Sequence, residues 1–345
     1  MNAVEERLGR VLAAHFDPRW GSAFWLARAA ALGFDPRREI RGVADLARLG
    51  PAPLEALALL PLEHFVPRRF HDVLHECVTA ETGGTTGPPR RTVFLRDEFE
   101  EAFVTPFLRA ARLVGFPRRA HWLFLGPSGP HPIGKAARAC AAAMGSVDPF
   151  SVDFDPRWAR RLSPDSLARR RYLEHVLEQA EPILASQRIG VLFATPPVLA
   201  ALGERLAPER RAEIVGIHLG GVAAAPGFGK ELAAKFPNAI VLGGYGNSLA
   251  GMCPQVAIAP NGPPEYFPCG ARLVLEVERV EGSRRGRVRF HRLDESGFLP
   301  NVLERDEAEP VAPPAHARGA GFVLPGLRDP RPPEATAEAK SPGLY

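Results

Sequence analysis

Apolar residues recur along this chain with two different spacings. In residues 4–16 and 25–32 they stand three or four positions apart, which predicts two amphipathic helices near the N-terminus. From about residue 92, helical stretches alternate with short apolar runs. The expected helices are 97–114, 135–144, 166–186, 197–206 and one around Lys230, and the expected strands are 122–125, 189–194, 213–218 and 239–243. This alternation predicts an α/β fold with a doubly wound, mostly parallel sheet and helices on both faces.

The pattern changes again near the C-terminal end. Residues 271–292 alternate β-branched and charged side chains, which indicates a small antiparallel β portion. The stretch from about residue 325 is rich in proline and poor in large apolar side chains, so it is expected to be weakly ordered. The predicted organisation is therefore a helical N-terminal cap (1–78), an α/β core (79–324) and a weakly ordered tail (325–345).

Composition narrows the class of protein. No apolar run in the 345 residues is long enough to span a membrane, and the mixed charges of residues 1–10 do not resemble a signal peptide, so a cytoplasmic location is expected. The 43 basic residues are balanced by 39 acidic ones spread along the whole chain, which argues against a nucleic-acid partner. The four cysteines, at 77, 140, 253 and 269, lack a C-x-x-C spacing and predict free thiols, with no metal site assigned.

The stretch TGGTTGPPRR at 82–91 carries the strongest chemical signal. Its glycines allow a tight turn and close backbone approach to a ligand, while the hydroxyls of Thr82, Thr85 and Thr86 can hydrogen-bond phosphate oxygens. Arg90 or Arg91 would supply positive charge. By themselves these residues predict either a phosphate-binding loop or a plain flexible turn.

This loop resembles that of the adenylate-forming superfamily, whose members carry S/T-S/T-G-T-T-G-x-P. The segments ALGFDP (31–36), VADLARL (43–49), FVPR (65–68) and RDEF (96–99) are similar to the phenylacetate–coenzyme A ligase branch. The likeness covers roughly residues 25–310 and implies the large N-terminal domain of these enzymes. It also implies their activity: ATP-dependent activation of a carboxylic acid, aromatic in this branch, to an acyl-adenylate, followed by transfer to coenzyme A, an amine or a carrier thiol.

Carried over position by position, the resemblance assigns the nucleotide site. The β- and γ-phosphates of ATP would be held by Thr82, Gly83, Gly84, Thr85, Thr86 and Gly87. HLGG (218–221) falls at the adenine-contacting motif, which gives Gly220 and Gly221. GYGNS falls on the aromatic-Gly-x-Thr-Glu motif, which gives Gly244, Tyr245, Gly246, Asn247 and Ser248. Arg305 matches a family arginine, and Asp306, displaced by about two positions, is the candidate for the ribose hydroxyls. The expected catalytic set is Thr85, Thr86, Arg90, Arg91, Ser248 and Arg305.

Three departures from the family pattern affect these expectations. Leu249 stands where the family has its magnesium-binding Glu, so Mg²⁺ would need another ligand such as Glu81. The ribose motif is degraded. The sequence stops where the family's small lysine-bearing C-terminal domain should begin, so a separate partner domain or a homodimer is an expected partner.

Other interpretations of the same residues remain open. Ser128, His131, His218 and Gly220 are candidates for contacting the acid substrate. Ser248 in a G-x-S-x-A context, with Asp294 and His316, imitates a serine-hydrolase triad. The chain is alternatively a nucleotide- or acyl-adenylate-binding module that needs a partner chain. Cys253 and Cys269, with His218 or His291, are weak zinc candidates.

Overall fold

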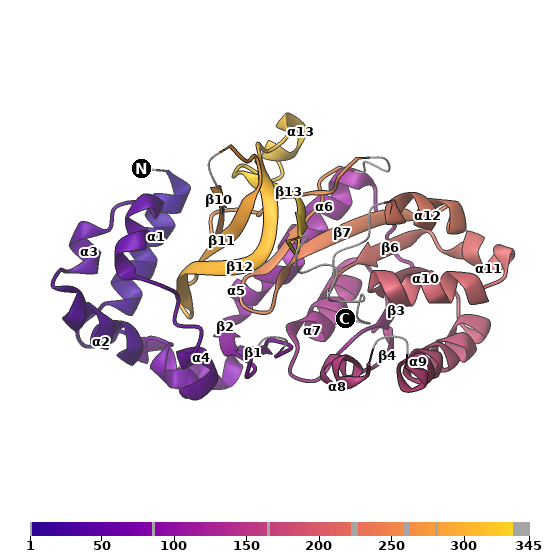
Figure 1. Cartoon of the computed structure of the whole chain (residues 1–345), viewed down its shortest axis with the longest axis horizontal. Helices are drawn as coiled ribbons and strands as arrows, with labels where there is room; N and C mark the ends of the chain where they lie inside the picture. The colour runs from indigo at the N-terminus through magenta and orange to yellow at the C-terminus, as the bar shows by residue number, and fades with distance from the viewer. Residues whose placement is uncertain are drawn as a thin grey trace.

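The computed structural model describes residues 2–84, 87–163, 166–221, 227–257, 262–279 and 282–333 (Figure 1). The α-helices are α1 Ala3–His15, α2 Ala23–Leu32, α3 Pro36–Glu39, α4 Ala56–Leu59, α5 Arg96–Phe99, α6 Thr105–Val114, α7 Pro132–Ala143, α8 Pro156–Arg161, α9 Leu167–Ser186, α10 Pro196–Arg205, α11 Pro208–Glu213, α12 Phe228–Lys235 and α13 Ala315–Arg318. Short 3₁₀ segments, η1 Val43–Leu49, η2 Leu62–His64 and η3 Arg68–Glu76, follow the first helices, and a π-helical turn, η4 Glu100–Val104, joins α5 to α6.

The strands form three sheets. They are β1 Val78–Glu81, β2 Arg91–Phe94, β3 His121–Leu125, β4 Phe150–Val152, β5 Ile189–Ala194, β6 Gly216–Leu219, β7 Ile240–Asn247, β8 Gly251–Pro254, β9 Glu265–Tyr266, β10 Leu273–Arg279, β11 Gly286–Leu293, β12 Phe298–Val311 and β13 Gly326–Arg331. The orders are β1-β2, then β4-β3-β5-β6-β7-β8, then β10-β11-β12-β13-β9.

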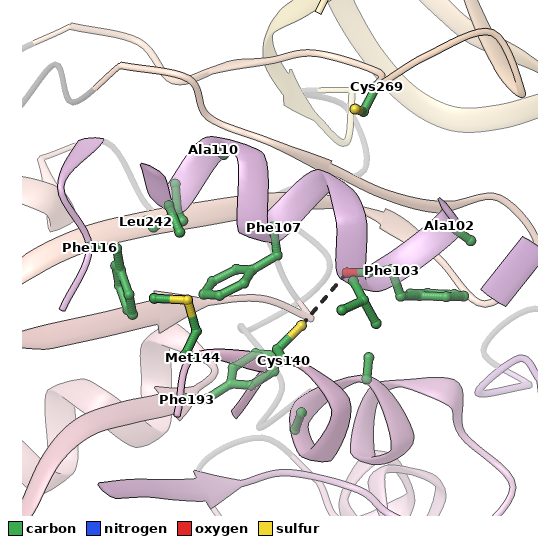
Figure 2. Packing of buried hydrophobic residues seen from close by; sticks show 14 of the residues in the cluster. Ala102, Phe103, Phe107, Ala110, Phe116, Cys140, Met144, Phe193, Leu242 and Cys269 are labelled. Atoms are coloured by element: carbon green, nitrogen blue, oxygen red, sulfur yellow. Dashed lines mark hydrogen bonds between the residues drawn. The ribbon is translucent and has the colours of Figure 1, made fainter. Parts of the chain in front are cut away.

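The six-stranded sheet is parallel from β4 to β7, and only its edge strand β8 runs antiparallel. Its strands are covered on both faces because alternate side chains point in opposite directions. In β3, Trp122 and Phe124 belong to a buried cluster with side chains of α6 and α7, part of which is drawn in Figure 2. Leu123 and Leu125 pack instead against α9 and α10. The predicted doubly wound sheet is thus confirmed.

The N-terminal helices pack on the antiparallel sheet. Apolar side chains of α1, α2 and η1 share one buried cluster with Leu293 and Phe298 of β11 and β12. The indole of Trp25 is fully buried there and donates a hydrogen bond to the Phe298 carbonyl at 3.2 Å. In Figure 1 the indigo helices accordingly lie beside β10, β11 and β12.

Two local predictions differ from the structure. The expected strand 213–218 is shifted, because Glu213 closes helix α11 and β6 begins only at Gly216. The weak order expected from residue 325 is wrong for Gly326–Arg331, which form β13 between β12 and β9. This proline-containing strand is stabilised by pairing with two neighbouring strands. The periodicity of its own sequence does not report such pairing.

Candidate active site

A pocket of about 510 Å³ lies between the carboxyl ends of the parallel strands and the antiparallel sheet. One wall comes from β6, β7 and the residues after them, a second from β11 and β12, and a third from the loop between β1 and β2. The sequence-predicted residues that line it are Thr82, Gly83, Gly84, Gly87, Arg90, His218, Gly220, Gly221, Gly244, Gly246, Asn247, Ser248 and Arg305. The fold therefore gathers motifs that are more than 200 residues apart in sequence.

The loop 82–90 is tied at its base by its two end residues. The backbone N–H of Thr82 donates to the Arg90 carbonyl at 2.9 Å, and the Arg90 N–H donates to the Thr82 hydroxyl at 2.9 Å. Gly84 has φ +62°, a left-handed conformation that favours glycine. Thr85 and Thr86 lie outside the described residues, so their predicted contacts with phosphate stay predictions.

The two neighbouring arginines of the loop point to different places. Arg90 lines the pocket, and its Nε donates to the Leu54 carbonyl at 3.2 Å. Arg91 begins β2, and its Nε donates instead to the Glu81 carboxylate at 2.9 Å. Arg91 does not line the pocket, so its predicted catalytic role has no support from its position.

Glycines at the strand ends allow protein side chains to pack closely against the backbone. A Cβ atom at Gly244 would stand 3.0 Å from Cγ of Met252, and one at Gly220 would stand 3.3 Å from the Phe193 ring. Asn247 then organises the turn that follows β7, since its side-chain oxygen accepts from the N–H groups of Leu249 and Ala250 at 2.8 Å each. Ser248, which follows Asn247 in this turn, lines the pocket.

Glu304 is a candidate that the sequence did not indicate. It lines the pocket and accepts a hydrogen bond from the Asn247 side chain. Burial, together with the neighbouring Asp306 carboxylate, raises its pKa to about 7. Arg287 on β11 was also missed; it lines the pocket and donates through Nε to the Glu304 carbonyl at 3.1 Å. Strand alternation around 287–292 predicted which residues share a face, but nothing local marked that face as a pocket wall.

Tyr245 and Asp306 are displaced from their predicted positions. They line a separate cavity of about 60 Å³, which shares Gly246, Asn247 and Glu304 with the large pocket. The Tyr245 hydroxyl donates to the Asp306 carboxylate at 3.1 Å. Burial raises the pKa of both side chains. Neither is among the residues that line the large pocket.

Ser128 and His131 are also not among the residues that line the large pocket. The exposed Ser128 hydroxyl donates to Asp153. His131 is buried beside the phosphate loop, where its Nδ1 lies 3.2 Å from the Glu81 carbonyl. Its neighbours Pro132 and Ile133 line the pocket in its place.

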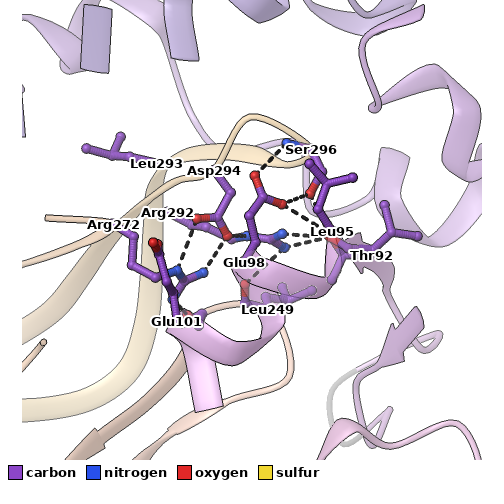
Figure 3. Close-up of polar contacts among 12 residues, drawn as sticks. Thr92, Leu95, Glu98, Glu101, Leu249, Arg272, Arg292, Leu293, Asp294 and Ser296 are labelled. Atoms are coloured by element: carbon purple, nitrogen blue, oxygen red, sulfur yellow. Dashed lines mark hydrogen bonds and ion pairs between the residues drawn. The ribbon is translucent and has the colours of Figure 1, made fainter. Parts of the chain in front are cut away.

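A fully buried ion network supports the turn that carries Ser248 (Figure 3). Arg292 donates to the Asp294 carboxylate at 2.6 Å and to the Leu249 carbonyl at 3.4 Å. Arg272 donates to Asp294 at 3.0 Å and to the Ala250 carbonyl at 2.6 Å. The arginines hold the Asp294 pKa at about 2 although burial opposes this shift. The network thus joins the antiparallel sheet to the end of β7.

The described residues do not fit a protein-held magnesium ion. Leu249 is buried in an apolar cluster, and the Glu81 carboxylate is occupied by Arg91 and Arg157. Glu304 is the single carboxylate among the described residues that line the large pocket. Within the described ranges no three His, Cys, Asp or Glu side chains form a metal-binding group; Cys253 and Cys269 are free thiols.

The proposed hydrolase triad is not supported by the positions of its members. The Asp294 carboxylate is held by Arg272 and Arg292, and His316 Nε2 contacts the Val256 carbonyl at 3.1 Å. Ser248 is in the pocket with neither of them among its lining residues.

The overall fold is similar to that of 2-hydroxyisobutyryl-CoA ligase. A crystal structure of that protein with 2-HIB-AMP and CoA in the thioesterification state superposes with a TM-score of 0.68 at 17% identity, covering 96% of this chain and 66% of that chain. An open conformation with the same ligands gives 0.67 at 15% identity, covering 94% and 68%. No protein-family model and no curated protein sequence matches this chain.

The class of fold follows from this likeness. The mostly parallel sheet with its additional antiparallel sheets is the fold of the N-terminal domain of adenylate-forming enzymes. This chain spans about two thirds of the length of the ligase structures it resembles. No helix in the described part of the chain has the length and apolarity that crossing a membrane requires.

Proposed function

We propose that this protein activates a carboxylic acid with ATP, forming an acyl-adenylate and pyrophosphate. One observation carries the proposal: the closed loop 82–90 and the carboxyl ends of β6 and β7 meet around a single pocket that Arg90 and Arg305 also line. A glycine-rich loop beside two cations is suited to a polyphosphate. The fold is one in which 2-hydroxyisobutyryl-CoA ligase holds an acyl-AMP and CoA.

The reaction that this geometry serves is an in-line displacement. A carboxylate oxygen of the acid attacks the α-phosphorus, the bond to the bridging oxygen breaks, and that oxygen leaves with pyrophosphate. The residues assigned to this step position the reactants and neutralise charge. Arg90 and the loop N–H groups bind the leaving phosphates, while the Ser248 hydroxyl donates to the α-phosphate. Arg305, exposed at the pocket rim, neutralises charge at the entrance.

The remaining parts of the proposal concern substrates and partners. The acid is aromatic, as in the phenylacetate–coenzyme A ligase branch. Magnesium enters as MgATP because the described pocket offers no free pair of carboxylates. The activated acyl group passes to coenzyme A, an amine or a carrier thiol.

A pyrophosphate-release assay over a panel of aryl acids, with MgATP and with or without coenzyme A, tests the activity. We expect release that depends on the acid. Calorimetric titration with AMP is carried out in parallel with the release assay. Binding of AMP without pyrophosphate release would identify a binding module that needs a partner chain; absence of both would contradict the proposal.

A further inference from the structure

The imidazole of His218 is held in one tautomer at the pocket wall. Its Nδ1 lies 2.8 Å from the Leu242 carbonyl on the neighbouring strand β7. A carbonyl oxygen only accepts hydrogen bonds, so Nδ1 carries the proton and Nε2 carries a lone pair. Burial also lowers the pKa of His218 to about 4, which keeps the ring neutral.

The His218 ring borders the pocket. His218 is only 4% exposed, yet it lines the pocket together with Gly244. Its Cε1, the carbon between the two ring nitrogens, is 3.4 Å from the position that a Cβ on Gly244 would take. Within the described part of the chain Nε2 has no hydrogen-bond partner, whereas Nδ1 is occupied.

The surroundings of this nitrogen are apolar. The ring centroid of Phe193 lies 4.3 Å from that of His218, and the centroid of Phe107 lies 4.8 Å away. Both phenylalanines belong to the buried cluster drawn in Figure 2. Phe103, Ile133 and Met252 line the same pocket. The arginines of the pocket come instead from the phosphate loop, β11 and β12.

We propose that the acid substrate carries a hydrogen-bond donor, a hydroxyl on its apolar part, which is recognised by His218 Nε2. This inference rests on the proposed function for the presence of the acid in the pocket. An acid without this hydroxyl would displace water from Nε2 and leave a buried acceptor without a partner. The site would therefore discriminate strongly between acids with and without the hydroxyl. The Gly244 position keeps space for such a group, since a side chain there would close over the ring.

Pairs of acids that differ by one hydroxyl test the proposal on the unmodified protein. Calorimetry in the presence of saturating AMP compares phenylacetate with its 2-, 3- and 4-hydroxy isomers, and isobutyrate with 2-hydroxyisobutyrate. We expect at least one hydroxylated acid to bind about 10- to 100-fold more tightly than its unsubstituted counterpart. Equal affinities in both sets, or no binding of any acid, would overturn the inference.

Two variants connect the preference to His218. His218→Phe keeps an aromatic ring and removes the acceptor, so the preference should disappear while the unsubstituted acid still binds; His218→Gln restores a carbonyl acceptor and should restore part of it. His71→Phe, at a half-buried histidine on η3, is the matched control and should keep the preference. Preference unchanged in a folded His218→Phe variant would overturn the inference. Hydroxyl-dependent binding without pyrophosphate release would contradict the proposed activity and leave the inference supported.

Discussion

Thr82 and Arg90 close the glycine-rich loop 82–90 by donating one backbone N–H each to the other residue, over 2.9 Å in both directions. The residues between them include Gly83, Gly84 and Gly87, which allow close backbone approach, and Pro88 and Pro89, whose rings fix φ. The loop is therefore closed at its base, and the Thr82 hydroxyl is one of the two acceptors that close it.

Replacing this hydroxyl should weaken nucleotide binding. Thr82→Val keeps the side-chain shape and removes the acceptor of the Arg90 N–H, and we expect about a 3- to 10-fold loss of affinity for ATP. Thr82→Ser keeps the acceptor and should bind ATP nearly as the unmodified protein does. Calorimetric titration with ATP measures both, and equal affinities for the Val and Ser variants would contradict the assigned role.

Arg90 and Arg91 offer a matched pair of substitutions. Arg90→Gln removes a cation that lines the pocket, and a lost charge-assisted hydrogen bond should cost about 10- to 100-fold in ATP affinity. Arg91→Gln removes only a half-exposed ion pair with Glu81, so it should change ATP affinity less than about threefold. The reverse order of effects would show that Arg91 is the phosphate ligand.

Glu304 should leave a signature in the pH dependence of stability. Its pKa is raised from 4.5 to about 7, mainly by burial, so the folded chain binds this proton more tightly than the unfolded chain. The free energy of unfolding therefore falls as pH rises from about 4.5 to 7 and loses nothing further from this group above pH 7.

Glu304→Gln removes this dependence. Relative to the unmodified protein, the variant should gain up to about 3 kcal/mol between pH 4.5 and 8, measured by urea unfolding across that range. Glu231→Gln, at an exposed position of α12, is the control and should run parallel to the unmodified protein. A Glu304→Gln curve that is also parallel would show that Glu304 is not protonated in the folded state at pH 5–6.

The Asp294 carboxylate neutralises the charges of two buried arginines, so its removal should lower the free energy of unfolding. Asp294→Asn leaves Arg272 and Arg292 without their shared carboxylate, and we expect a loss of about 3–5 kcal/mol in the free energy of unfolding at pH 7. Because the Asp294 pKa is lowered from 3.8 to about 2, its contribution is complete above pH 3.8 and disappears as pH falls through 2.

The neighbouring acid serves as the control for that measurement. Glu295 pairs at the surface with Arg69, so Glu295→Gln should cost less than about 1 kcal/mol. Urea unfolding at pH 7 compares the two variants. Similar losses for both would mean that the buried network contributes no more than a surface ion pair.

The sequence by itself determined the class of fold and the position of the glycine-rich loop 82–90. Helical and strand periodicities report which residues are buried, and the strands 122–125 and 189–194 were predicted nearly as they occur in β3 and β5. The glycines of loop 82–90 and of the ends of β6 and β7 were recognisable because close backbone approach needs them whatever surrounds them.

Tertiary structure decided how the side chains are distributed around the pocket. Arg90 and Arg91 differ by one position, yet Arg90 lines the pocket and Arg91 pairs with Glu81, because adjacent residues point in different directions and only the packed strands define which direction is the pocket. Glu304 and Arg287 reach it through the register of β11 on β12, and β13 forms by pairing with distant strands. These features depend on long-range contacts, which no local pattern of residues encodes.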